Sequence, residues 1–157
     1  MSLAPNIQIR AATLSDIPEI LRHRRRMYED MHYTDATALT AMATLTSDYL
    51  YKAIPDGTFR AWLACDANRA IAGGAVHIAP WPAHPYDREC RRATILNVYT
   101  DPPYRRLGIA RQLMLTMIAW CEQEGFSRIT LHASDDGRHL YESLGFEPTN
   151  EMRLKLR

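Results

Sequence analysis

The sequence lacks several features that would indicate whole classes of protein. Its three cysteines have no paired spacing, so neither a disulfide framework nor a cysteine metal site is indicated. Its six histidines form no closely spaced pair, and we expect no metal ion. The N-terminus has no apolar signal core, and no apolar run approaches the ~20 residues that span a bilayer. These absences predict a cytoplasmic protein without a membrane partner.

An excess of charge of one sign is also missing. The formal net charge is +1, which creates no overall field that would recruit nucleic acid, and we expect no nucleic-acid partner. The one local exception is the basic run at residues 22–26, which falls within a predicted amphipathic helix. We interpret this run as a solvated helix face, and a docking surface for an acidic partner is the alternative.

What is present is typical of one soluble globular unit. The chain has 157 residues, of which 46% are hydrophobic and 24% charged, enough for a hydrophobic core. No linker or composition shift divides it, so we predict a single domain over residues 1–157.

Hydrophobic periodicity predicts an alternation of strands and helices. A capping-box pattern at residues 13–16 begins the first predicted helix, and a glycine at position 125 ends a later one. We predict strands at 7–10, 59–65, 70–78, 94–99, 129–132 and 151–156, and helices from 13 to about 31 and at 36–53, 108–124 and 136–143. This order, β-α-α-β-β-β-α-β-α-β, predicts an α/β fold with a mixed sheet flanked by helices.

The most informative segment runs from Tyr104 to Arg111, between a predicted strand and a long predicted helix. A helix N-terminus offers unpaired N–H groups and the positive end of the helix dipole. Gly108 lets an anion approach the backbone, and the small Ala110 keeps the next turn open. With two arginines in the loop, the segment is suited to bind a diphosphate. The alternative is an ordinary helix start whose arginines are solvated.

The same segment resembles a known family. Arg105-x-x-Gly108-x-Ala110 matches the Q/R-x-x-G-x-G/A signature of the GNAT acetyltransferase superfamily. About thirty residues later, the segment from Leu140 through Tyr141 to Glu147 is similar to the second hallmark of that superfamily. The predicted element order is also that of the superfamily, so we expect a GNAT-like fold along nearly the whole chain.

The resemblance implies an N-acetyltransferase, an acyltransferase that uses acetyl-CoA as co-substrate and needs no metal. The pyrophosphate would lie on the signature loop, and the pantetheine arm would pair with the main chain of the preceding strand. Ser134 replaces an asparagine that contacts the cofactor in many members. The residues expected to bind the cofactor are Val98, Tyr99, Thr100, Arg105, Arg106, Leu107, Gly108, Ile109, Ala110, Arg111 and Ser134.

Tyr141 occupies the position of the superfamily's usual general acid. A tyrosine is protonated at neutral pH, so it can donate a proton to the departing thiolate. The general base stays open, because the strand at 94–99 lacks the carboxylate that many members place there. A water chain is one alternative, and the side-chain candidates are Glu29, Asp30, His77, His84, Asp87 and Glu89.

The acceptor is expected to be an amine of a small molecule or peptide, entering over the first two helices and the long loop at 79–92. Carboxylates close to aromatic side chains in both places would suit a cationic amine. The expected acceptor-site residues are Tyr28, Met31, Trp81, Tyr86 and Asn97. A homodimer agrees with the resemblance, and a non-catalytic acetyl-CoA sensor or interaction domain is the alternative function.

Overall fold

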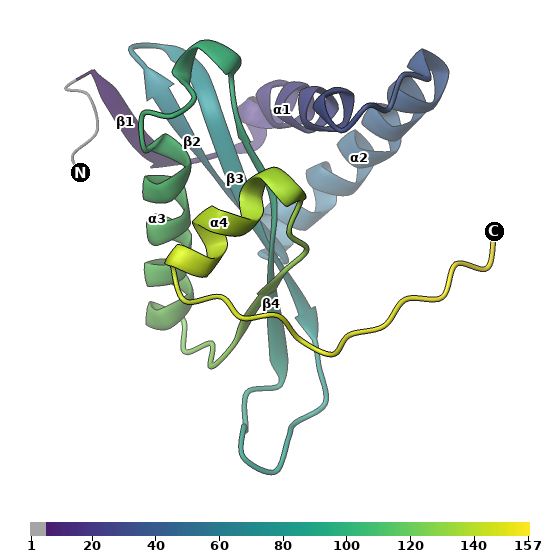
Figure 1. Ribbon diagram of the computed structural model, residues 1–157, viewed down its shortest axis with the longest axis vertical. Coiled ribbons are helices and arrows are strands. Elements are labelled where there is room, and N and C mark those ends of the chain that lie inside the picture. The colour runs from purple at the N-terminus through teal and green to yellow at the C-terminus, as the bar shows by residue number, and fades with distance from the viewer. Residues whose placement is uncertain (1–5) are drawn as a thin grey trace.

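A five-stranded sheet forms the centre of the computed structural model, which describes residues 6–157 (Figure 1). The first five residues of the expected domain lie outside the described residues. The strands follow one another in the order β1-β2-β3-β4-β5. Their bounds are β1 Ile7–Ala11, β2 Phe59–Asp66, β3 Arg69–Pro80, β4 Arg91–Thr100 and β5 Ile129–Leu131. The helices are α1 Ile17–Asp30, α2 Ala36–Asp56, α3 Ile109–Gln123 and α4 Asp135–Ser143.

The sheet is mixed, as the predicted order of elements requires. Strands β1 to β4 pair antiparallel with their neighbours, whereas β4 and β5 are parallel. Helix α3 supplies the crossover between β4 and β5, because parallel neighbours cannot be joined by a tight turn. The predicted α/β class and the mixed sheet are therefore confirmed.

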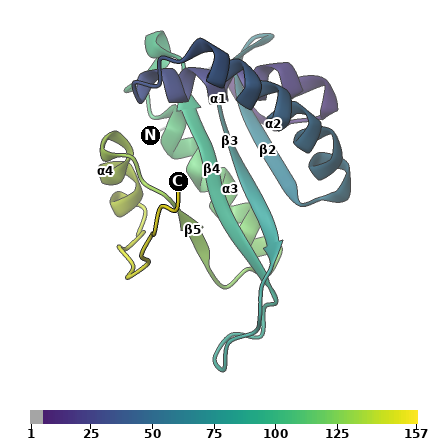
Figure 2. The same cartoon turned by 90° about the vertical axis from the view of Figure 1, so that its right-hand side faces the viewer.

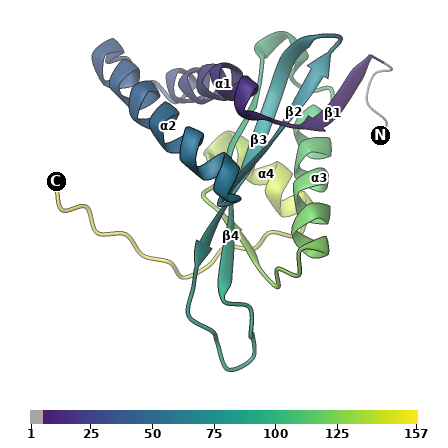
Figure 3. The same ribbon diagram turned by 180° about the vertical axis from the view of Figure 1, so that it is seen from behind.

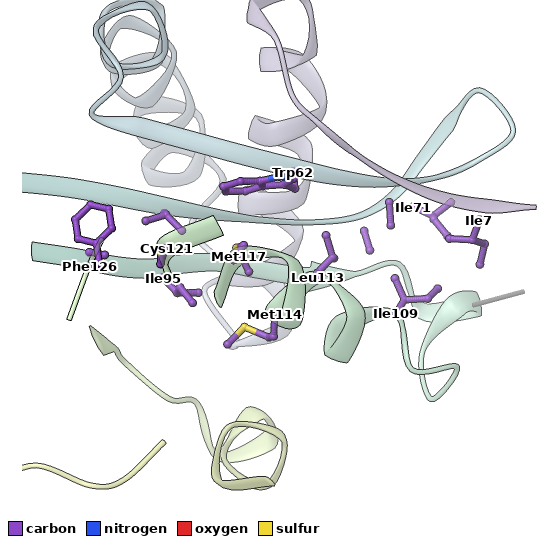
Figure 4. Packing of buried hydrophobic residues seen from close by; sticks show 14 residues of the cluster. Ile7, Trp62, Ile71, Ile95, Ile109, Leu113, Met114, Met117, Cys121 and Phe126 are labelled. Carbon is purple, nitrogen blue, oxygen red and sulfur yellow. The ribbon is translucent and has the colours of Figure 1, made fainter. Parts of the chain in front are cut away.

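Helices cover both faces of the sheet (Figures 1 and 3). Helices α1 and α2 pack on one face through a cluster that includes Ile17, Leu50 and Phe59. Helix α3 packs on the other face, where Leu113, Met114 and Met117 of α3 meet residues of the strands (Figure 4). These three α3 side chains are fully buried, so the helical spacing of apolar residues seen in the sequence does mark the core-facing side.

Local signals account for the start of α1. Asp16 accepts hydrogen bonds from the main-chain N–H of Thr13 at 2.8 Å and from Arg10 at 2.8 Å through each carboxylate oxygen. The capping box is present, although its first turn, Leu14–Asp16, is a 3-10 helix rather than part of α1. The hydrogen bonds from Arg10 lower the pKa of Asp16 to about 2. The expected helix start is thus tied to the end of β1 by a bidentate ion pair.

Strand β4 carries a β-bulge that shapes the site. Gly73 of β3 is opposite Tyr99, and Ala75 is opposite Leu96, so β4 has one residue more than β3 across this stretch. Asn97 sits in the bulge with a φ of 59°, a conformation that asparagine tolerates better than most residues. Figure 2 shows β4 continuing past β5, toward α1 and α2.

The predicted closing strand at 151–156 is wrong. This segment forms no strand, and it leads away from the body of the molecule (Figures 1 and 3). Met152, Leu154 and Leu156 are 94%, 83% and 85% exposed. Their alternation has the period of a strand, but a strand also needs a hydrogen-bonded neighbour, and β5 pairs with β4 over only three residues. The alternation of apolar residues was therefore not enough to predict a strand here.

Candidate functional site

A cavity opens where β4 and β5 separate. The two strands pair only from Ala93 to Ile95 of β4, and β4 then continues to Thr100 without β5 beside it. A cavity of about 990 Å³ occupies this region, lined by α1 and the turn after it, β4, the loop before α3, the end of β5 and α4. This volume is at the upper end of the range for small-molecule and cofactor sites.

Most of the residues expected to bind a cofactor meet in this cavity. Those that line it are Val98, Tyr99, Thr100, Arg105, Arg106, Ala110 and Ser134. The remaining four do not belong to its lining, namely Leu107, Gly108, Ile109 and Arg111. Ile109 is 1% exposed and packs in the core, and Arg111 donates a hydrogen bond to Ser143 of α4 at 3.0 Å. The side chains of Ile109 and Arg111 therefore hold the loop and the helix in place.

The N-terminus of α3 is open to an anion. Gly108 precedes the helix with a φ of 79°, and Arg106 has a φ of 67°. No side chain caps the first turn of α3. The first N–H groups of the helix are consequently unpaired at the positive end of its dipole, and Arg106 and Ala110 of this segment reach the cavity.

The guanidinium of Arg105 is held by groups of the protein itself. Its guanidinium donates to Asp30 at 2.5 Å and to the main-chain oxygen of Thr100 at 2.9 Å, and it lies 5.6 Å from the centre of the Tyr99 ring. Arg105 lines the cavity, and the expected contact of its side chain with a phosphate would have to share or replace these partners. Arg105 thus joins the signature loop to the end of α1.

The edge of β4 that faces the cavity has free main-chain groups. Asp101 donates its N–H to Ile71 of β3 at 2.8 Å, so alternation directs the main-chain groups of Thr100 to the other side. The oxygen of Thr100 accepts from Arg105, as described above, which leaves its N–H for a ligand. The Thr100 hydroxyl is buried without a hydrogen-bond partner, a further polar group that a ligand could satisfy.

Tyr141 reaches the same cavity from α4, on the opposite side from β4. Burial raises the pKa of its hydroxyl above the usual value, so the group stays protonated at neutral pH. The ring packs edge-on against Phe146, with 6.2 Å between ring centroids. Gly137 lies so close that a Cβ there would be 2.8 Å from the ring. The absence of a side chain at position 137 thus decides where Tyr141 lies.

Ser134 has a second task that the sequence did not indicate. Its hydroxyl oxygen accepts a hydrogen bond from the main-chain N–H of Gly137 at 3.2 Å and caps α4. The expected contact with a cofactor would have to share that oxygen. Ser134 accordingly positions the helix that carries Tyr141.

Of the candidate bases, only Asp30 lines the cavity. Asp30 is already engaged by Arg105, and Glu29 is paired with both Arg25 and Arg26. The other candidates lie outside the lining, in β3 or in the hairpin connection after it: His77, His84, Asp87 and Glu89. Asp87 accepts from Ser127 and Glu89 from Arg91, so both have structural partners.

The expected acceptor residues divide into two groups. Tyr28, Met31 and Asn97 line the cavity. Trp81 and Tyr86 do not, because they lie in the connection of the long β3–β4 hairpin, which projects from the body (Figure 1). They are 51% and 93% exposed. The expected entry of the acceptor over this loop would therefore bring it to Trp81 and Tyr86 outside the cavity.

A family profile decides which group of proteins this site belongs to. The profile of the Acetyltransferase (GNAT) family matches residues 18–146, from α1 to the segment after α4. The chain belongs to the GNAT family. Among solved structures, a GCN5-related N-acetyltransferase from Ralstonia eutropha JMP134 has a TM-score of 0.88 and is 31% identical, with 96% of this chain and 98% of that chain covered.

Two further relatives carry more specific names. A predicted acetyltransferase with acetyl-CoA from Clostridium acetobutylicum has a TM-score of 0.85 and is 25% identical, covering 96% of both chains. The human N-acetyltransferase 8 is 29% identical over 122 residues. That match covers 76% of this chain and 50% of the human protein, so this GNAT chain corresponds to about half the length of its curated relative.

The GNAT site contains residues that the sequence did not point to. Arg24, Met27, Gly137 and Arg153 line the cavity. Arg24 belongs to the basic run interpreted as a solvated face, and no local pattern indicates that it meets Asn97, because the two residues lie 73 positions apart in α1 and β4. One feature of the sequence could have indicated that Gly137 contacts Tyr141: it lies four residues before it, one helical turn away.

The described residues lack both a metal-binding cluster and a membrane-spanning helix. Residues 6–157 contain no group of three or more histidine, cysteine, aspartate or glutamate side chains able to hold a metal ion. Within the same range, none of the helices combines the length and apolar character that crossing a membrane requires.

Proposed function

We propose that this GNAT chain transfers an acetyl group from acetyl-CoA to a primary amine of a small molecule or peptide, within a ternary complex. The observation that carries the proposal is that an open helix N-terminus, an unpaired strand edge and a half-buried, protonated tyrosine all border one cavity. Acetyl-CoA, when bound, supplies an activated thioester.

The main chain of residues 106–110 is suited to hold the pyrophosphate of the co-substrate. The unpaired N–H groups and the dipole of α3 attract an anion, and Arg106 adds a positive charge beside them. The pantetheine arm would run along Val98 to Thr100, where β4 has no strand beside it. The N–H of Thr100 is then the donor best placed to polarise the thioester carbonyl.

Tyr141 would protonate the sulfur as it leaves. Its raised pKa keeps the hydroxyl protonated beforehand. The neutral amine would attack the thioester carbonyl, the C–S bond would break as Tyr141 protonates the departing sulfur, and the proton lost by the new amide nitrogen would return to Tyr141. The cysteines are unsuited to a covalent route, since Cys65 and Cys121 are buried and burial raises the pKa of Cys121 to about 11. We infer that the acceptor ammonium loses its proton to water, because Asp30 is held by Arg105.

Calorimetric titration with acetyl-CoA is the first test. The wild type should show saturable binding, and Gly108→Glu should lose it, because a carboxylate at the start of α3 repels the pyrophosphate. Tyr141→Phe should keep acetyl-CoA binding and lose about 10²-fold or more in kcat over a panel of amines. Full turnover in Tyr141→Phe would refute the acid assignment, and binding without turnover of any amine would favour an acetyl-CoA sensor.

A further inference from the structure

The wall that α1 contributes to the cavity carries one arginine without a carboxylate partner. Four arginines lie in the run at residues 22–26, and three of them are paired: Arg22 with Glu19 and Asp101, and Arg25 and Arg26 with Glu29. Arg24 forms no ion pair with any carboxylate of residues 6–157. It is the one arginine of the run that lines the cavity.

Neutral groups hold Arg24 in place. One terminal nitrogen donates to the side-chain oxygen of Asn97 at 2.6 Å, and the other lies 3.4 Å from the hydroxyl of Tyr28. The guanidinium also lies over the Tyr28 ring, 5.1 Å from its centre. Nε is buried and has no partner. A guanidinium has five N–H donors, so these contacts fix its orientation and leave donors unused.

This arrangement is costly in the absence of an anion. A half-buried charge that is paired only with an amide and a phenol has lost water without gaining a counter-ion. Two carboxylates line the cavity: Asp30 of α1 is neutralised by Arg105, and Asp136 lies on α4, the helix that carries Tyr141, rather than on α1. Arg24 is thus oriented toward a site that an anionic group would complete.

We propose that Arg24 binds a carboxylate of the acceptor, and hence that the acceptor is an amine that also carries a carboxylate, as a free α-amino acid does. The proposal rests on the acetyl transfer proposed above. Asn97, which orients Arg24, lies in the bulge directly before Val98, so the carboxylate would bind close to the strand edge proposed for the thioester. Amine and carboxylate must therefore be only a few bonds apart in the acceptor.

A carboxylate fits the fork of a single arginine better than a phosphate does. The two oxygens of a carboxylate accept two parallel N–H bonds from one guanidinium. A phosphate monoester carries up to two negative charges and is best bound by more than one cation. Arg106 and Arg153 also line the cavity, but they lie in the segment proposed for the pyrophosphate and in the C-terminal segment, and Arg24 is held by Asn97 and Tyr28. We therefore assign the site to a carboxylate rather than to a phosphorylated amine.

The test compares each acid with its neutral amide. The protein is saturated with coenzyme A, which prevents reaction, and the dissociation constants of the common α-amino acids and their C-terminal amides are measured by calorimetry. We expect at least one amino acid to bind about 10- to 100-fold more tightly than its amide. In Arg24→Met the preference should disappear, and Arg24→Lys should retain part of it because a charge remains without the fork. Arg26→Met, whose wild-type side chain is 63% exposed and paired with Glu29, is the matched control and should keep the full preference.

Other outcomes would overturn the inference. Equal binding of acids and amides, no binding of any amino acid, or tighter binding of glucosamine 6-phosphate would each contradict a carboxylate site at Arg24. Acetyl transfer is measured on the same compounds with acetyl-CoA. Transfer without preference for acids would overturn this inference and leave the proposed function intact. Acid-dependent binding without transfer would overturn the proposed function and leave only a carboxylate-binding site at Arg24.

Discussion

Gly137 offers the sharpest test of how the fold positions Tyr141. Gly137→Ala would place a Cβ 2.8 Å from Cε2 of the Tyr141 ring and 3.1 Å from its hydroxyl oxygen. Ordinary contact begins near 3.4 Å, so the ring must move by roughly half an ångström or more. The hydroxyl lies at the end of that ring and would move with it.

The substitution should separate activity from stability. Alanine is favoured over glycine within a helix by about 1 kcal/mol, which offsets part of the steric cost in α4. A displacement approaching 1 Å at a reacting group can cost about 10²-fold in rate. We therefore expect kcat to fall about 10- to 100-fold in Gly137→Ala, with little change in the melting temperature and in acetyl-CoA affinity.

A double-mutant cycle decides whether the effect acts through the hydroxyl. Turnover of the best amine is measured for the wild type, Gly137→Ala, Tyr141→Phe and the double variant. If the alanine acts by displacing the hydroxyl, it should cost nothing further once that hydroxyl is absent. The reasoning is refuted if Gly137→Ala is fully active, or if it is equally damaging in the Tyr141→Phe background.

Two further predictions concern stability. Gly73→Ala would place a Cβ 3.0 Å from Nδ1 of His23 and 3.3 Å from a main-chain oxygen, whereas Gly74→Ala meets mainly the flexible end of Met117 at 2.8 Å. In urea unfolding, Gly73→Ala should cost about 1–3 kcal/mol and Gly74→Ala less, and the reverse order would contradict this. Burial lowers the pKa of His23 from 6.5 to about 4, so the unfolded chain binds the proton more readily. The free energy of unfolding should then fall as the pH drops from 6.5 toward 4, and an equal slope in His23→Gln would rule out His23 as the cause.

The order of elements followed from local features of the sequence. The apolar spacing of Leu113, Met114 and Met117 and the glycine after α3 are local signals, and the structure confirms the helix they predict. The strand pattern at residues 151–156 was equally local and yet wrong, because a strand exists only if another strand pairs with it. Local periodicity therefore predicts an element well only where the neighbouring elements are present to bury it.

The site likewise has features that are local in the sequence and features that depend on tertiary structure. The glycine that opens the N-terminus of α3 is a local feature that the sequence shows by itself, and the family resemblance implied a role for Tyr141. That Tyr141 borders the same cavity as β4 depends on how α4 packs. Only the tertiary structure decided the partners of the arginines: Arg105 turned to Asp30, and Arg24 met Asn97 across 73 residues of chain. Charge pairing depends on distances between separate elements. The bulge in β4 that contains Asn97, the partner of Arg24, is a property of two paired strands rather than of one.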